Sequence, residues 1–299
     1  MSIDLVVEAQ VHDLGGFTVR RVLPSAQRRM VGPFVFFDHM GPADFPAGLP
    51  RSADVRPHPH IGLSTVTYLF DGEMRHQDSL GSDEQIRPAE VNWMTAGRGI
   101  THSERFDGPI RERGGRLHGI QAWVALPEAL EQTDPAFAHH SGPSDLPYYE
   151  GAGMKARLIA GEVFGAKAAV KIHSPMFYAH WELAAGASGS LPPEYPERAA
   201  YVASGAVEVA GERYEAGRML FFAPGDTVAM TATEASTVML LGGEPLGHRH
   251  VWWNFVASSR ERIEQAKLDW QAGRFALPPH DHDEFIPLPK DAFPPAHAH

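Results

Sequence analysis

The segment Leu63-Ser-Thr-Val-Thr-Tyr-Leu-Phe70 decides the fold class of this 299-residue chain. It is rich in β-branched and aromatic residues, which favour strands. Asp71-Gly72 follows at once and is a typical two-residue hairpin turn, so a return strand is expected over residues 73–78. This part of the sequence therefore predicts an antiparallel β-hairpin.

Short apolar or alternating runs of the same kind recur along the chain, separated by turns rich in Gly and Pro. The chain contains 29 Gly and 25 Pro, which favours many turns and few long helices. This texture predicts an all-β fold, either a sandwich or a barrel. Further strands are expected over residues 91–94, 100–106, 117–126, 156–159, 176–183, 199–202, 206–209, 219–223 and 237–241.

A repeat divides the chain into two similar β-modules. Thr67–Met74 and Ala200–Val207 each combine a strand, a glycine turn and a return strand. Between them, residues 127–153 are rich in Pro, Gly, Asp and Ser, which is typical of a domain connector. We therefore expect two domains, an N-terminal β-module over residues 1–140 and a C-terminal β-module over residues 141–299.

One helix is expected near the C-terminus, over residues 259–273, and we assign it to the C-terminal domain. Ser258 and Ser259 can cap its start, apolar residues recur at helical spacing, and Gly273 ends it. Its apolar stripe is expected to pack on a barrel. The tail beyond it is rich in Pro and His, and we expect it to be extended or disordered. Its histidines could bind metal adventitiously. The histidines of this tail are His280, His282, His297 and His299.

Two close pairs, His58-Pro-His60 and His102-Ser-Glu104, carry most of the chemical information in the sequence. Residues two apart on a strand point to the same face, so each pair can offer two ligands to one point. Three imidazoles and one carboxylate suit a divalent transition metal such as iron, nickel, copper or zinc. His58, His60, His102 and Glu104 are therefore predicted to bind a metal ion, and a six-coordinate ion keeps two positions open.

The second module lacks this ligand set. When the repeat is aligned, Leu191 and Pro193 take the positions of His58 and His60, and Met219–Ala223 offers no histidine. The sequence therefore predicts one metal ion, bound in the N-terminal module.

The bulk composition is that of a soluble intracellular protein. A formal net charge of −11 argues against a protein whose main work is direct binding of nucleic acid phosphates. The chain has no cysteine, which excludes disulfides and thiolate chemistry. The first residues lack the basic and apolar regions of a signal peptide, and no apolar run is long enough to span a membrane. We expect a cytoplasmic protein.

Several segments resemble the pirin family of the cupin superfamily, from about residue 14 to residue 275. The block ending in His102-Ser-Glu104 is the most specific of them. The resemblance implies two tandem cupin β-barrels, with one mononuclear metal site in the N-terminal barrel, held by the three histidines and Glu104. The segments that carry it are Phe37–Pro42, His58–His60, Thr65–Leu69, Met74–Gly81, Trp93–Glu104, Leu117–Val124 and Gly243–Gly247.

Two positions depart from the usual pattern. Ser64 stands where many pirins and most cupins carry Glu, and Ile61 stands where Arg is usual. We expect Glu104 to supply the missing carboxylate ligand. We expect Ile61 to make the mouth of the site less basic.

Three functions are compatible with the resemblance. The first is a quercetin 2,3-dioxygenase-like activity, in which a flavonol ring is opened by O2, with Glu104 as the base and a small aromatic polyphenol as substrate. The second is a metal- and redox-dependent regulatory protein that binds a protein partner. The third is a non-redox metal-dependent isomerase or hydrolase. We rank the dioxygenase first, with Fe2+ as the first choice of metal and Mn, Ni, Cu or Zn as alternatives, and with a monomer as a plausible state.

The remaining prominent residues are given structural interpretations. Trp252–Phe255 is expected to fill a junction between the barrels and the last helix. His76 and His118 are interpreted either as pocket residues or as structural histidines on strands. His139-His140 is expected to be solvated.

Overall fold

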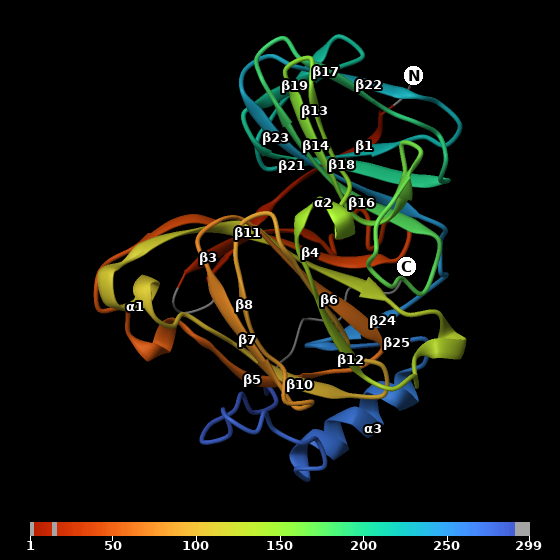
Figure 1. Ribbon diagram of the computed structural model, residues 1–299. Coiled ribbons are helices and arrows are strands. Elements are labelled where there is room, and N and C mark those ends of the chain that lie inside the picture. Colours follow the sequence, from red (N-terminus) through yellow and green to blue (C-terminus); the bar gives the residue numbers. More distant parts are fainter. Residues whose placement is uncertain (1–2, 14–16, 291–299) are drawn as a thin grey trace. The chain divides into compact units, whose positions relative to one another are not determined.

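The computed structural model describes residues 3–13 and 17–290, and in this part of the chain strands dominate (Figure 1). The strands form two cupin barrels, and the 12-residue helix α3 (Arg260–Gln271) lies near the C-terminus. The predicted all-β class with two cupin barrels and a short C-terminal helix is confirmed. The chain divides into two compact units, each of which contains one barrel.

The first unit consists of the described chain up to Val11, Arg20–His39 and His140–Leu246. Its larger sheet has the order β1-β21-β18-β23-β16-β14-β13, with β15 beside β14, and its smaller sheet the order β17-β22-β19-β20. Apolar side chains such as Trp181 and Leu240 fill the core. Its elements are β1 (Ile3–Glu8), α2 (Gly142–Asp145), β13 (Tyr148–Gly151), β14 (Met154–Val163), β15 (Ala166–Lys167), β16 (Met176–Leu183), β17 (Ser188–Leu191), β18 (Glu197–Ser204), β19 (Ala206–Val209), β20 (Glu212–Glu215), β21 (Arg218–Phe222), β22 (Val228–Ala232) and β23 (Ser236–Gly243).

The second unit contains the described part of His12–Val19, then Met40–His139 and the described chain from Gly247 onward. Its sheets have the orders β12-β9-β6-β11-β4-β3-β2 and β5-β10-β7-β8, and β24 and β25 form a separate ribbon. Its elements, with β2, β3, β4 and β12 divided between the units, are β2 (Gln10–Asp13), β3 (Thr18–Leu23), β4 (Phe34–Phe45), η1 (Arg51–Ala53), β5 (Val55–His60), β6 (Leu63–Asp71), β7 (Met74–Asp78), β8 (Asp83–Ile86), β9 (Val91–Thr95), β10 (Ile100–Arg105), α1 (Pro109–Arg113), β11 (Gly115–Ala125), η2 (Glu128–Leu130), β12 (Ala136–His140), β24 (His250–Trp252), β25 (Phe255–Ala257) and α3.

The hairpin that decided the fold class is present as β6 and β7, joined at Gly72. Gly72 has a φ of +86°, and a Cβ there would lie 2.1 Å from the carbonyl oxygen of Arg116, so only glycine fits. Gly205 holds the equivalent turn between β18 and β19, with a φ of +71° and a Cβ position 2.3 Å from the carbonyl oxygen of Ala235. The predicted repeat therefore corresponds to the same turn in both barrels.

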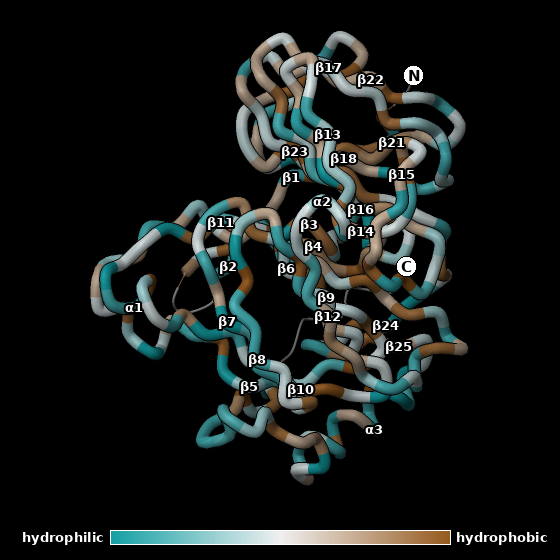
Figure 2. Tube along the Cα trace, viewed as in Figure 1, coloured by the Kyte–Doolittle hydropathy of each residue, from teal (hydrophilic) through white to brown (hydrophobic). Residues whose placement is uncertain are grey.

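Hydrophobic and hydrophilic stretches alternate along the strands of both units (Figure 2). The alternation explains why most strands could be predicted closely; β16 and β19 have the expected bounds. The long strand β4 was missed because Gly41-Pro42 within it is typical of a turn. Residues 127–153, interpreted as a connector, contain β12, which joins the larger sheet of the second unit.

The two units are not consecutive in the sequence, unlike the domains that we expected. β1 pairs with β21 and lies in the first unit, although it begins the chain. Helix α3, which we assigned to the C-terminal domain, lies in the second unit. Its buried residues Ile263 and Trp270 pack with Ile61 of the loop after β5, so burial of its apolar stripe determines where it belongs.

The end of the described chain runs beside β5 and β10 (Figure 1). Asp281 accepts two hydrogen bonds of 2.7 Å from the buried guanidinium of Arg105 on β10, and the Ile286 amide donates to the Pro57 carbonyl at 2.8 Å. The tail up to Lys290 has no regular secondary structure, yet these bonds hold it in place. His297 and His299 lie outside the described residues.

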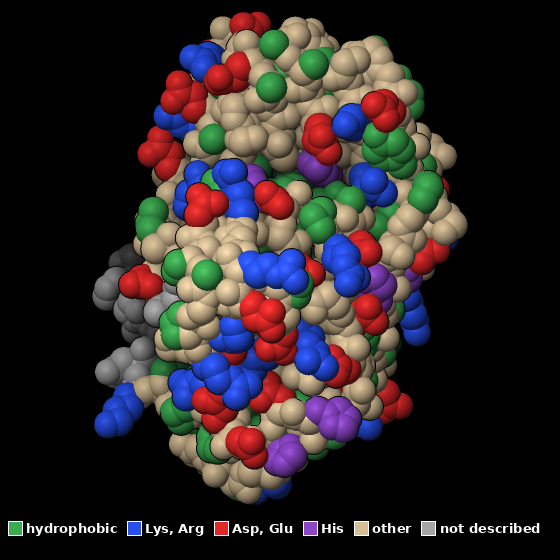
Figure 3. All heavy atoms as spheres, turned by 60° about the vertical axis from the view of Figure 1, so that its left-hand side comes forward, with side chains coloured by type: hydrophobic (Ala, Val, Ile, Leu, Met, Phe, Trp, Pro, Cys, Tyr) green, Lys and Arg blue, Asp and Glu red, His purple; other side chains and the backbone are tan. Residues whose placement is uncertain are grey.

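Acidic and basic side chains are interspersed over the face of the molecule that Figure 3 shows. In the described ranges, no helix has both the length and the apolar character needed to cross a membrane.

Candidate metal centre

The three predicted histidine ligands lie together on two neighbouring strands of the second unit. His58 and His60 are on β5, and His102 is on β10, which pairs antiparallel with β5 so that His102 lies opposite His58. All three are buried, with at most 6% of their surface exposed. Each offers one nitrogen, and these nitrogens lie within 4.8 Å of one another. In the described part of the chain this is the group whose geometry could hold a metal ion.

Hydrogen bonds fix the orientation of the rings on β5. His58 Nδ1 lies 2.9 Å from the carbonyl oxygen of Arg56, and His60 Nδ1 lies 3.1 Å from that of Asn254. A carbonyl can only accept, so both Nδ1 atoms carry the proton. The lone pairs of both rings are therefore on Nε2, the tautomer that ligates a metal through this atom.

The Nε2 atoms of His60 and His102 lie 3.1 Å apart. With metal–nitrogen bonds of about 2.1 Å, two ligands at a right angle stand about 3.0 Å apart and two at a tetrahedral angle about 3.4 Å apart. The observed separation is that of neighbouring ligands in an octahedral sphere. His60 Nε2 carries a lone pair, and His102 Nε2 can present one in the matching tautomer, so a cation between the two nitrogens could be bonded by both and the donor set fits a metal ion.

Burial keeps these imidazoles neutral. It lowers the pKa of His58 to about 4, and it holds the pKa of His60 and of His102 well below the ordinary value, with repulsion between the histidines as a further cause. Metal ligation requires the neutral form. The rings are therefore ready to bind a metal across the physiological pH range.

We expect the metal-free protein to lose stability as the pH falls from 6.5 towards 4. In this window the unfolded chain protonates a residue that the folded protein keeps neutral, so protons favour unfolding; for His58 alone the change is about 3 kcal/mol. Thermal unfolding of the metal-free protein at several pH values measures it. H58Q should flatten the pH dependence, and equal slopes for the variant and the parent would contradict the assignment.

Glu104 lies two residues after His102 on β10 but is not one of the three residues in the cluster. Its Oε1 accepts a 2.8 Å hydrogen bond from Gln121 Nε2 on β11, while Thr67 on β6 donates to Gln121 at 3.0 Å and lies 3.5 Å from the same Oε1. Burial raises the pKa of Glu104 above its ordinary value, and the neighbouring His76 and these hydrogen bonds offset only part of the rise. The carboxylate thus lies between the two sheets of the barrel, held through one oxygen.

One of the two departures from the cupin pattern does not act as we expected. Ile61 does not line the mouth of a site, since it is 1% exposed and packs with Phe255 and α3. Ser64 bonds the Thr95 hydroxyl at 3.0 Å and lies on the face of β6 opposite to Thr67, because side chains alternate along a strand. Ser64 therefore points away from the face that reaches Glu104.

The barrel of the first unit, which is the C-terminal barrel in the sequence, has the same arrangement of strands but lacks the histidine ligands. β17 pairs with β22, as β5 pairs with β10, and Leu191 lies opposite Val228. The partner strand is therefore β22 and not Met219–Ala223, the strand that the sequence alignment indicated. Neither β17 nor β22 contains a histidine, and Leu191 is part of the hydrophobic core.

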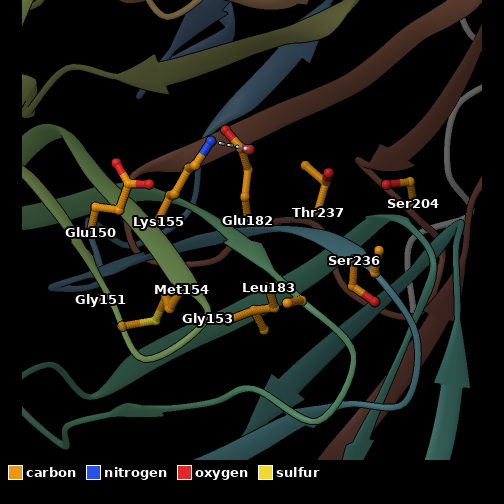
Figure 4. Close-up of a pocket in the computed structure, with 12 residues that line it drawn as sticks. Glu150, Gly151, Gly153, Met154, Lys155, Glu182, Leu183, Ser204, Ser236 and Thr237 are labelled. Atoms are coloured by element: carbon orange, nitrogen blue, oxygen red, sulfur yellow. Dashed lines mark ion pairs between the residues drawn. The ribbon is translucent and has the colours of Figure 1, made fainter.

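A cavity of about 630 Å³ opens at the surface of the first unit, lined by β13, β14, the end of β16 and the start of β23 (Figure 4). Lys155 and Glu182 form an ion pair of 4.0 Å at its rim. It contains no histidine and none of the predicted ligands.

Sequence reasoning missed the backbone and side-chain groups that hold the site. The Asn254 carbonyl that orients His60 is 194 residues away in the sequence. Trp252–Phe255, interpreted as packing, does pack with α3, but its turn also supplies this carbonyl. His139 and His140 are half-buried rather than solvated and bond Asn92 and Asp145.

The fold and the histidine triad define the class of the protein, a two-barrel cupin in which one barrel has a potential metal site. Two family models match the chain, the pirin model over residues 16–124 and the pirin C-terminal cupin domain over residues 178–276. The chain belongs to the pirin family.

Known proteins resemble the chain over most of its length. A pirin-like protein of Caulobacter vibrioides is 65% identical over 288 residues, which cover 96% of this chain and 100% of that protein. A Pseudomonas aeruginosa protein, provisionally named a quercetin 2,3-dioxygenase, is 39% identical over 263 residues, or 87% of this chain and 80% of that one. The crystal structure of quercetin 2,3-dioxygenase from Acinetobacter baumannii matches with a TM-score of 0.86 and 34% identity, covering 95% of this chain and 94% of that chain.

Proposed function

We propose that the protein is a mononuclear metal-dependent dioxygenase that opens the ring of a flavonol such as quercetin with O2. The observation that carries the proposal is the set of three buried, neutral histidines whose nitrogens lie within 4.8 Å of one another. The likeness to proteins named quercetin 2,3-dioxygenase supports this choice of substrate class. The cytoplasm remains the expected location.

We further propose that Glu104 is the fourth ligand, beside His58, His60 and His102. Its Oε1 is bonded by Gln121, so Oε2 is the oxygen that can turn towards the ion. When bound, a redox-active divalent metal would supply Lewis acidity and an electron-transfer route between the substrate and O2. Fe2+ is the first choice, with Mn, Ni, Cu and Zn as alternatives.

The residues around the triad suit a flat, weakly acidic substrate. The indole of Trp123 stands edge to face against His60, with ring centroids 5.2 Å apart, and gives the site an aromatic wall. Glu104 is the carboxylate nearest in sequence to a ligand, and a base held in a buried site can take the proton of a flavonol 3-hydroxyl. The barrel interior excludes water from the opened ring.

The test is oxygen uptake together with loss of flavonol absorbance, in protein purified without O2 and loaded separately with Fe2+, Mn2+, Ni2+, Cu2+ and Zn2+. We expect one O2 to be consumed per flavonol lost, in at least one redox-active form and not in the Zn2+ form. H102A, loaded in the same way, is the matched control and should show no uptake.

Equal uptake in the metal-free control and in every metal form would contradict the proposal. Turnover of another substrate by the Zn2+ form would favour an isomerase or hydrolase. A protein that binds a redox metal without any turnover would favour the regulatory function.

A further inference from the structure

His102 differs from the other two histidines of the triad in how its ring is held. His58 and His60 bond backbone carbonyls, but His102 Nδ1 lies 3.3 Å from Nδ1 of another histidine, His76 on β7. His76 Nε2 in turn lies 3.0 Å from Asp78 Oδ2. His76 and Asp78 are 5% and 0% exposed, so water does not replace either partner.

The strand register places this chain of three side chains. On β10 and β7, His102 lies opposite Asp78, and Glu104 lies opposite His76. The ring of Phe137 on β12 stacks on His76 at 4.4 Å between centroids and 11° between planes, which fixes the plane of the imidazole. Asp78 Oδ1 accepts from the amides of Leu80 and Ser82, so the carboxylate cannot rotate away.

The proton positions along the chain follow from the acceptor at its end. The Asp78 carboxylate accepts, so His76 Nε2 donates, and in the neutral imidazole of His76 the Nδ1 atom is left to accept. His102 Nδ1 must then carry a proton and donate it to His76. The lone pair of His102 consequently lies on Nε2, which faces His60 Nε2 at 3.1 Å.

We propose that Asp78 is a positioning residue that sets the tautomer of His102 through His76. A carboxylate normally orients a metal-bound histidine directly, whereas here a second imidazole lies between the two. The inference rests on the proposed metal site but not on the reaction. His102 is the one ligand of the triad whose tautomer depends on side chains and can therefore be changed by substitution.

Asp78→Asn is expected to reverse the donor and acceptor roles in the hydrogen bonds that join residue 78, His76 and His102, without changing the shape of the side chain. The asparagine oxygen still accepts the hydrogen bonds from the amides of Leu80 and Ser82. The asparagine NH2 group therefore faces His76 Nε2, which must now accept. His76 Nδ1 then donates to His102, and the proton of His102 moves to Nε2. A protonated Nε2 has no lone pair for a metal, as when a triad aspartate is replaced by asparagine and its histidine takes the wrong tautomer.

His76→Gln is the matched control. Its amide can accept from His102 through oxygen and donate to Asp78 through nitrogen, so the order of donors and acceptors is preserved. His76→Leu removes both bonds. If these side chains served packing alone, the isosteric Asp78→Asn would lower Zn2+ affinity least of the three changes. The proposed series of hydrogen bonds instead predicts that Asp78→Asn and His76→Leu both lower it.

The experiment measures Zn2+ affinity by competition with a chelator, and the ¹⁵N shifts of the His102 ring in the metal-free full-length protein. We expect D78N and H76L to bind Zn2+ about 10- to 100-fold more weakly than the parent, and H76Q to stay within about threefold. In D78N the His102 proton should move from Nδ1 to Nε2.

An unchanged Zn2+ affinity in D78N, or a His102 proton that stays on Nδ1, would overturn the proposal. If D78N does not fold, H76Q and H76L decide the matter, because equal affinities of these two variants would also overturn it. Neither readout involves oxygen or flavonol. Failure of the dioxygenase assay in a protein that passes this test therefore contradicts the proposed function alone.

Discussion

Replacement of His102 by alanine is expected to reduce bound metal from one ion per chain to none. His102 faces His60 at 3.1 Å and lies opposite His58, so its loss removes two of the three contacts within the cluster and one of its three nitrogen ligands. H58A should have the same effect. The measurement is metal content after equilibrium dialysis against Fe2+ under anaerobic conditions, with H139A as a control histidine that lies outside the triad.

Tail histidines are the main source of error in this count, since a His-rich terminus can hold metal adventitiously. The parent should therefore be measured with His297 and His299 replaced by alanine. One ion in H102A, or two ions in the tail variant, would contradict a single centre built on the triad.

Glu104→Gln is expected to weaken metal retention and to eliminate flavonol turnover. The substitution keeps an oxygen for the bond from Gln121 but removes the negative charge that a divalent ion attracts and the base that the reaction needs. Metal retention against a chelator and O2 uptake measure the two effects separately. E112Q, the same change at an exposed position of α1, should behave as the parent.

If E104Q holds metal as tightly as the parent and still consumes O2, Glu104 is neither ligand nor base. If it retains metal but loses turnover, it is a base that does not ligate. Only the loss of both supports the full assignment.

The local part of the fold could be predicted from the sequence. Alternation along Leu63–Phe70 and the Gly72 turn depend on neighbours in the chain, so β6, β7 and their repeat β18–β19 were correctly predicted. The pairs His58-His60 and His102-Glu104 also carry their geometry locally, because strand periodicity puts both members on one face.

Long-range packing determines the rest. Nothing near Ile61 in the sequence indicates that its side chain packs against α3, about 200 residues later, so its expected place at the mouth of the site was wrong. The Asn254 carbonyl and the His76–Asp78 pair likewise depend on register between strands and on a distant turn. Long-range packing also places β1 in the first unit and α3 in the second, although they lie at opposite ends of the sequence from those units' main segments.

The most direct test of the metal centre is the anomalous scattering of crystals loaded with Fe2+, recorded above and below the iron absorption edge. We predict one strong peak per chain, bonded to Nε2 of His58, His60 and His102 and to a carboxylate oxygen of Glu104, with two positions left for other ligands. A peak elsewhere in the chain, or a peak at the triad with Glu104 still directed only at Gln121, would contradict the proposed centre.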